Sequence, residues 1–201
     1  MRKSAEEARR TRDRIVGAAV GQASSLGLTG LTIGALAETL EMSKAGVVGP
    51  FGTRADLQLA TLDRAAELFT EAVVAPGRTA RPGLPCLHAV IDAWCAYLAD
   101  SPFPNGCFVT AASCELDGQP GELRARLREA VVRWRRFLAG QVAAAQAEGD
   151  LAANADPEDL VSVLAGLAMA ANQEIQLLGD EHAAPRARRL MRAALAAHRP
   201  A

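Results

Sequence analysis

The sequence predicts an all-α protein of about nine helices. Alanine, leucine, arginine and glutamate are plentiful, whereas β-branched and aromatic residues are sparse, and this balance favours helix over strand. Between the Gly- and Pro-rich breaks, apolar residues recur every three or four positions, the period of an amphipathic helix. With 201 residues, 50% hydrophobic and 22% charged, the chain has the composition of an ordinary globular protein.

The first 52 residues predict three helices. A first helix is expected from about residue 6 to residue 26, where Gly27 can end it. Thr32 is placed to cap a second helix, and Ser43 a third short one that carries Lys44 and turns Val47 inward. Two short capped helices joined by a tight turn at residues 41–42 are typical of a helix-turn-helix, which places one helix in the DNA major groove.

The remaining residues, 53–201, predict a larger helical domain. Thr53 and Asp56 form a capping-box-like pair at the start of a helix that is expected to end near residue 75, before a loop at 76–83. Asp156 is expected to cap a later helix that has Pro157 in its first turn. The expected helices after residue 76 span 85–99, 107–116, 122–148, 157–178 and 183–198.

The helix expected at 157–178 is apolar nearly all round. Leu160, Leu164 and Leu167 lie on one side, and Val163 and Ala170 lie on another. A helix of this kind must be buried on both sides. In a chain of this size a second subunit plausibly covers one side, so we expect a homodimer formed through the last two helices.

Charge is distributed unevenly along the chain. Residues 1–56 carry eight Lys/Arg and six Asp/Glu, a net charge of +2, which leaves −3 for the rest of a chain whose total is −1. Six of those basic residues, Arg12 among them, lie in the first 14 positions, where they can supply phosphate contacts or form a solvated terminus. No run of apolar residues was expected to reach the length of a membrane span, and no secretory signal is evident, so a cytoplasmic protein without a membrane partner is expected.

Seven of the eight aromatic residues lie between positions 69 and 137. These rings either line an apolar ligand chamber or form the core of the larger domain. Asn172 interrupts an apolar helix and either orients a ligand or bonds a neighbouring helix. The candidate pocket residues are Phe69, Trp94, Tyr97, Phe103, Phe108, Trp134 and Asn172.

The amino-terminal pattern resembles the tetracycline-repressor (TetR) family of transcriptional regulators. The resemblance is carried by TRDRIVGAA at 11–19, Gly27, LTIGALAETLEMSKAGV at 31–47, Phe51-Gly52, Arg54 and Asp56-Leu57. It implies a DNA-binding domain at 1–52, a ligand-binding and dimerisation domain at 53–201, and a two-fold dimer on a near-palindromic operator. It also implies that a small molecule shifts the spacing of the two reading heads and releases the DNA.

The resemblance assigns roles to individual positions. Thr32, Ser43, Lys44 and Arg54 resemble phosphate contacts of the family, and Thr53 lies in the same region; for the three hydroxyl residues, helix capping is the alternative or additional role. Ala45, Gly46, Val48 and Gly49 fall where the family reads base edges.

Two departures from the family pattern stand out. The recognition helix ends in Val48-Gly49-Pro50, where the family commonly has Tyr and His, so guanine-reading side chains are absent. Specificity would then depend on DNA shape, thymine methyl groups and the amino-terminal arm. Glu41 occupies a turn position where the family usually has Gly, and a left-handed backbone there would cost on the order of 1 kcal/mol.

Two other classes of function were weighed. An enzyme is disfavoured, because no nucleophile elbow, metal cluster or phosphate loop is evident and the pairs His88–Asp92 and Cys114–Glu115 have no third partner. A helical interaction module with weak or non-specific DNA binding remains the alternative to a ligand-responsive repressor. No cofactor or metal is predicted, and the four cysteines are expected to be buried structural thiols, with a redox switch as the minority interpretation.

Overall fold

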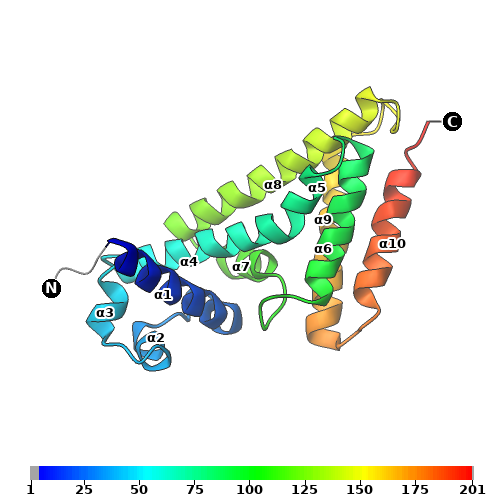
Figure 1. Ribbon diagram of the computed structural model, residues 1–201. Helices are drawn as coiled ribbons and strands as arrows, with labels where there is room; N and C mark the ends of the chain where they lie inside the picture. The colour runs from blue at the N-terminus through cyan, green and yellow to red at the C-terminus, as the bar shows by residue number, and fades with distance from the viewer. Residues whose placement is uncertain (1–4, 201) are drawn as a thin grey trace. The chain divides into compact units, whose positions relative to one another are not determined.

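The computed structural model describes residues 5–200, and every regular element in this range is helical (Figure 1). The predicted all-α class is confirmed. The helices are α1 (Ala5–Leu26), α2 (Ile33–Thr39), α3 (Lys44–Val48), α4 (Arg54–Phe69), η1 (Thr70–Val74), α5 (Ala75–Arg78), α6 (Leu84–Ala99), α7 (Phe108–Leu116), α8 (Glu122–Ala147), α9 (Pro157–Leu178) and α10 (Ala183–Ala196).

Three of these elements, α4, η1 and α5, follow one another without a break, so they correspond to one predicted helix. That helix was expected to end near residue 75, but it continues to Arg78. Pro76 lacks an N–H and its ring crowds the carbonyl four residues earlier. The backbone accommodates it by widening to a π-helix, in which Ala75 N–H donates to the Thr70 carbonyl.

The chain forms two compact units that are each discontinuous in sequence. Among the described residues, the first comprises 5–67 and 103–127, and the second comprises 68–102 and 128–200. Helix α7 therefore groups with the amino-terminal helices. These units are groupings of contacts, and the predicted division into functional domains at 1–52 and 53–201 stays a prediction.

Each of the helices α1 to α4 contributes buried apolar side chains to the core of the first unit. Ile15 on α1, Leu36 on α2, Val47 on α3 and Leu57 on α4 are each at most 1% exposed. Burial of each such side chain contributes about 1.5–3 kcal/mol relative to leaving it in water. The short helices α2 and α3 are therefore fixed mainly by packing, because isolated helices of 7 and 5 residues are unstable in water.

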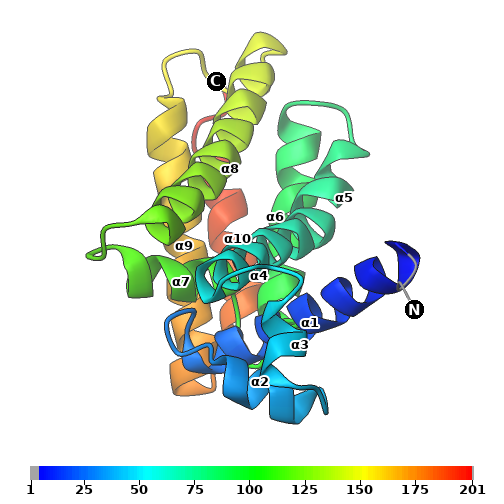
Figure 2. The same cartoon turned by 90° about the vertical axis from the view of Figure 1, so that its left-hand side faces the viewer.

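The second unit is built around α6, α9 and α10, which pack against one another, while η1 and α5 pack on α6 (Figure 2). Gly77 on α5 is needed for this contact, because a Cβ at that position would lie 2.2 Å from Val90 Cγ2 on α6. The core includes Leu87, Leu138, Leu164 and Met191, each at most 1% exposed.

Helix α9 has one side in this core and another side exposed. Leu160, Val161 and Leu164 are buried, whereas the neighbouring Val163 and Met169 are 45% and 48% exposed. By length and composition α9 is also apolar enough to cross a membrane, so the expectation that no segment reaches that threshold is wrong. The core helix of a soluble protein passes the same test.

Candidate DNA-binding and ligand-binding sites

Helices α2 and α3 are each capped by the hydroxyl that the sequence predicts. Thr32 Oγ1 accepts a hydrogen bond from Ala35 N–H at 3.3 Å, and Ser43 Oγ accepts one from Gly46 N–H at 3.0 Å. Each cap satisfies one of the backbone donors that a helix start leaves unpaired. The capping roles are confirmed, and the two hydroxyls begin helices that lie side by side in the first unit.

The turn between α2 and α3 contains a left-handed residue. Glu41 has φ of +52°, the one positive φ at a non-glycine among the residues that the structure describes. Met42 N–H donates to the Ala37 carbonyl at 2.9 Å, which closes the turn. The Arg14 guanidinium on α1 donates to the Leu40 carbonyl at 3.3 Å and satisfies another group at the end of α2. The left-handed backbone on which the expected cost at Glu41 depends is thus present.

None of the predicted DNA-contacting residues is buried. Two of them, Gly46 and Val48, are partly covered, and Val47 between them is fully buried, as predicted. The exposed members of the set are Arg12, Thr32, Ser43, Lys44, Ala45, Gly49, Thr53 and Arg54. Their role in DNA binding stays a prediction, but each is accessible for it.

The start of α4 is closed by the predicted capping pair. Thr53 N–H and its hydroxyl both donate to Asp56 Oδ2, at 3.2 and 2.6 Å, and Asp56 N–H donates back to Thr53 Oγ1 at 3.1 Å. Arg54 Nε donates to the Leu31 carbonyl at 3.0 Å and its Nη2 donates to the Thr29 carbonyl at 2.6 Å. Arg54 therefore has a structural role that the sequence analysis did not anticipate, beside the predicted phosphate contact.

The 27–31 loop between α1 and α2 is held by a second set of side chains. Glu115 on α7 accepts hydrogen bonds from Leu28 N–H at 2.9 Å, Thr29 N–H at 2.7 Å and the Thr29 hydroxyl at 2.6 Å. The buried Gln58 on α4 donates to the Leu28 carbonyl at 2.6 Å. Sequence patterns did not indicate either contact, since interactions over 86 and 30 residues leave no periodic signal in one sequence.

Arg12 on α1 lies next to the loop that follows α3. Its guanidinium carbon is 4.9 Å from the ring centroid of Phe51, a cation–π geometry that is worth about 0.5–1 kcal/mol at an exposed site. Phe51 N–H and Gly52 N–H both donate to the Val48 carbonyl, at 2.9 and 3.0 Å, and so fold the chain back after α3. Arg12 is thereby oriented beside the carboxyl end of the short helix.

An aromatic cluster occupies the second unit. The ring centroid of Phe69 lies 5.1 Å from that of Trp134, 5.5 Å from that of Tyr97 and 6.3 Å from that of Trp94, all edge to face. Phe137 stacks on Trp134 at 5.9 Å. We call these five residues the aromatic cluster. Edge-to-face pairs each add about 0.5–1.5 kcal/mol beyond the area that they bury.

The predicted pocket residues do not all come together. Phe103 and Phe108 belong to the first unit, where their rings pair with each other at 5.8 Å, and Asn172 lies half-buried on α9 in the second unit. The structure thus brings together Phe69, Trp94, Tyr97 and Trp134. Ligand binding by any of these residues stays a prediction.

Three of the four cysteines, Cys86, Cys95 and Cys107, are buried, as expected. Cys114 is exposed, so the expectation that all four are buried is wrong for this residue. Burial raises the pKa of the Cys95 thiol to about 11 and also raises the pKa of the Cys86 thiol. Since the thiolate is the reactive form, these two cysteines have the chemistry of inert core residues.

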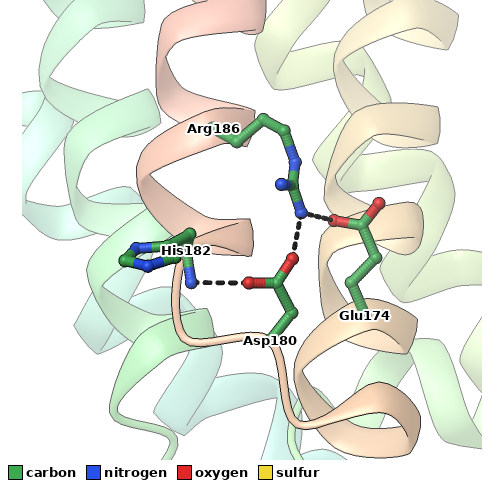
Figure 3. A network of polar contacts seen from close by, with 4 residues as sticks. All are labelled: Glu174, Asp180, His182 and Arg186. Carbon is green, nitrogen blue, oxygen red and sulfur yellow. Dashed lines mark hydrogen bonds and ion pairs between the residues drawn. The ribbon is translucent and has the colours of Figure 1, made fainter.

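The turn between α9 and α10 is fixed by a charged network (Figure 3). The Arg186 guanidinium on α10 donates to Glu174 Oε2 on α9 at 2.8 Å and to the Asp180 carboxylate in the turn. The backbone N–H of His182 donates to Asp180 Oδ1 at 2.8 Å. This network joins the last two helices at the end where the chain reverses.

A capped helix-turn-helix with its third helix exposed, followed by a helical bundle that contains an aromatic cluster, defines the class of helical transcription regulators. Residues 83–191 match the sequence profile of the family described as tetracyclin repressor-like, C-terminal domain. This match covers more than half of the chain, so the protein belongs to the tetracycline-repressor family. Its members are regulators of transcription and not enzymes.

Solved structures agree with this assignment. A TetR transcriptional regulator from Chloroflexus aurantiacus J-10-FL has a TM-score of 0.89 and 21% identity, over 96% of this chain and 98% of that one. The regulator AibR, solved with isovaleryl coenzyme A and operator DNA, has a TM-score of 0.67 and 19% identity, over 83% and 85%. A regulator from Saccharomonospora viridis, solved with choline, has a TM-score of 0.75 and 19% identity, over 92% and 95%. A comparison with the sequences of curated proteins found no match.

Proposed function

We propose that this ligand-responsive transcriptional regulator is a repressor that binds a palindromic operator as a homodimer. The observation that carries the proposal is the surface formed by α2 and α3, residues 32–49, which we call the reading head. On α3 and its carboxyl cap, Lys44, Ala45 and Gly49 are exposed, and the buried Val47 anchors the helix to the core. Operator DNA in the AibR complex supports it. In a two-fold dimer the two recognition helices would enter grooves about 34–36 Å apart, or a multiple of that distance.

The exposed apolar side of α9 supports the homodimer. Val163, Met169, Leu177 and Leu178 on α9, with Leu190 on α10, are 43–74% exposed. Exposed large apolar side chains that gather into a patch are typical of an interface. Pairing of α9 and α10 with their copies in a second subunit would remove it from water, and it accounts for the apolar character of α9 without a membrane, as expected for a cytoplasmic regulator.

The effector is proposed to be a small, largely apolar molecule that binds at the aromatic cluster. Phe69, Trp94 and Tyr97 are each at most 7% exposed and offer ring faces and edges rather than charges. The effector would release the operator by population shift, because it binds the DNA-incompetent arrangement of the dimer more tightly than the competent one. The complexes of AibR with an acyl coenzyme A and of the S. viridis regulator with choline support regulation by small molecules.

A footprinting experiment tests the proposal. Purified protein is expected to protect a near-palindrome in the DNA upstream of its own gene, and a compound that raises the melting temperature should abolish the protection. If the protein protects no palindrome at low salt, operator binding is refuted. Protection that no stabilising compound relieves would refute effector control.

The second candidate is an interaction module with non-specific DNA binding. One observation favours it: positions 45, 46, 48 and 49 carry Ala, Gly, Val and Gly, whose side chains cannot form hydrogen bonds with bases. A salt series separates the two candidates. Equal affinity for the protected site and for random duplexes at every salt concentration would support the module, because phosphate contacts carry no sequence information.

A further inference from the structure

The outward face of α3 is made of small apolar groups. Positions 45, 48 and 49 are spaced i, i+3 and i+4, so they share one face of the helix. Ala45 and Gly49 are exposed and Val48 is half-exposed, while Val47 turns inward and is fully buried. Beside Lys44 at its amino end, this face presents methyl groups and bare backbone.

Two arginines beside α2 and α3 make contacts within the protein. Arg54 donates to two carbonyl oxygens at the 27–31 loop, through its Nε and Nη2. The guanidinium of Arg12 lies over the ring of Phe51. Neither is positioned on α3 to supply the bidentate fork that reads the O6 and N7 atoms of guanine.

An apolar face discriminates between base pairs by the apolar group that it contacts. In the major groove an A·T pair and a G·C pair each display two acceptors and one donor, and the A·T pair alone adds an apolar group, the 5-methyl group of thymine. Covering the polar groups without replacing their bonds to water is unfavourable for both pairs. Contact of a methyl with a methyl removes apolar surface from water and is favourable.

We propose that α3 reads A·T base pairs through the 5-methyl groups of thymines, which contact Ala45 and Val48. This inference rests on the proposed sequence-specific binding of DNA by the reading head. Gly46 and Gly49 have no side chains and offer bare backbone to the groove. Ala45 and Val48, which carry methyl groups, are therefore the residues that reach the thymines. The centre of each half-site should accordingly contain thymines.

The first stage of the test is selection of duplexes from a random library by the full-length protein. A palindrome whose half-site centres are A·T is expected. G·C pairs at those centres would overturn the inference and leave sequence-specific binding intact. If no sequence is enriched, the proposed function fails together with the inference, so the two failures are distinguishable.

The second stage replaces each selected thymine with uracil, which keeps base pairing and removes only the methyl group. Affinity is expected to fall about fourfold for each thymine in contact with Ala45 or Val48. Replacing the same T·A pair with 5-methylcytosine·guanine restores the methyl and should recover more affinity than plain cytosine. Unchanged affinity after every uracil replacement would overturn the inference in favour of readout by DNA shape.

The third stage assigns the contact to the protein. Val48→Ala should weaken binding to the thymine duplex, and uracil at the thymine that contacts residue 48 should then have a smaller effect than in the parent protein. The matched control is Val109→Ala on α7, which removes the same two methyl groups from a half-buried valine outside the reading head. Equal loss of affinity in both variants, or an undiminished uracil effect in Val48→Ala, would overturn the assignment.

Discussion

Both units of this protein have an apolar core, but they differ in the contacts that supplement it. In the first unit, single polar side chains on α4 and α7 bind the backbone of the 27–31 loop, at distances of 2.6–3.0 Å. In the second unit, aromatic and aliphatic side chains fill the core, and ion pairs such as Arg186–Glu174 and Arg192–Asp92 lie at its surface. A polar contact depends on exact geometry, whereas an apolar core tolerates exchange of residues of similar volume.

In the first unit these directed bonds fix the 27–31 loop, in addition to the apolar packing that fixes α2 and α3. Individual positions carry the resemblance in the first 57 residues, whereas the family profile matches residues 83–191.

The largest expected effect is the loss of stability when a charge is placed on the buried side of α9, compared with the same charge on its exposed side. Leu164→Asp places a charge at a position that is 1% exposed, and it should reduce the free energy of unfolding by about 4 kcal/mol or more, or prevent folding. Val163→Asp places the same charge one residue away at a position that is 45% exposed, and it should leave the helix content intact while making the protein monomeric. Circular dichroism with urea unfolding and light scattering measure the two quantities. A dimeric Val163→Asp variant would contradict the proposed interface.

The next effect tests the polar contacts of the first unit. Glu115→Gln replaces one acceptor oxygen with an NH₂ group that faces a backbone N–H, so it should cost about 1–3 kcal/mol. Amide hydrogen exchange at Leu28 and Thr29 should become faster.

The control for that variant is Glu129→Gln on α8, whose exposed ion pair with Arg133 has an N–O distance of 3.9 Å. It should change stability by at most about 0.5 kcal/mol. Equal effects of the two substitutions would show that the contacts of Glu115 with the loop are unimportant.

Sequence patterns predicted interactions between residues close in sequence and missed interactions between residues far apart in sequence. Thr32, Ser43, Thr53 and Asp156 were recognised as caps because capping acts over two or three residues, and each is confirmed. The buried stripe of α9 was recognised from its period. Glu115 and Gln58 were not, because the loop that they bind is distant in sequence.

Candidate-site residues follow the same rule. The aromatic residues were grouped by position along the chain, and the structure separates Phe103 and Phe108 from the other rings because residues 103–127 pack with the amino-terminal helices. The extension of the helix through Pro76 was also missed, since a π-helical turn has no sequence signal as clear as a proline.

A smaller effect compares two cations of the reading head. Lys44→Ala should weaken DNA binding about equally for all sequences and reduce the magnitude of the salt slope by about 0.9 for each lost phosphate contact, without changing stability. Arg54→Ala should do the same and, in addition, lower stability by about 1 kcal/mol, because the carbonyls of Thr29 and Leu31 lose its bonds. Fluorescence anisotropy over a salt series and urea unfolding measure the two effects. A loss confined to one DNA sequence would contradict a phosphate role for either residue.

The smallest expected effect is a pH dependence at the turn between α9 and α10. The hydrogen bonds from Arg186 and from the His182 backbone lower the pKa of Asp180. A lowered pKa means that the ionised carboxylate stabilises the folded state fully above the ordinary Asp pKa of about 3.9, and that this contribution is lost as the pH falls through the lower, folded-state value. Asp180→Asn removes the titration but keeps an oxygen acceptor. The melting temperatures of the parent protein and this variant should therefore differ at pH 7 and converge below about pH 4. If the difference in melting temperature stays constant across this range, the ionisation of Asp180 does not contribute to stability, and the effect of the substitution comes from the shape of the side chain.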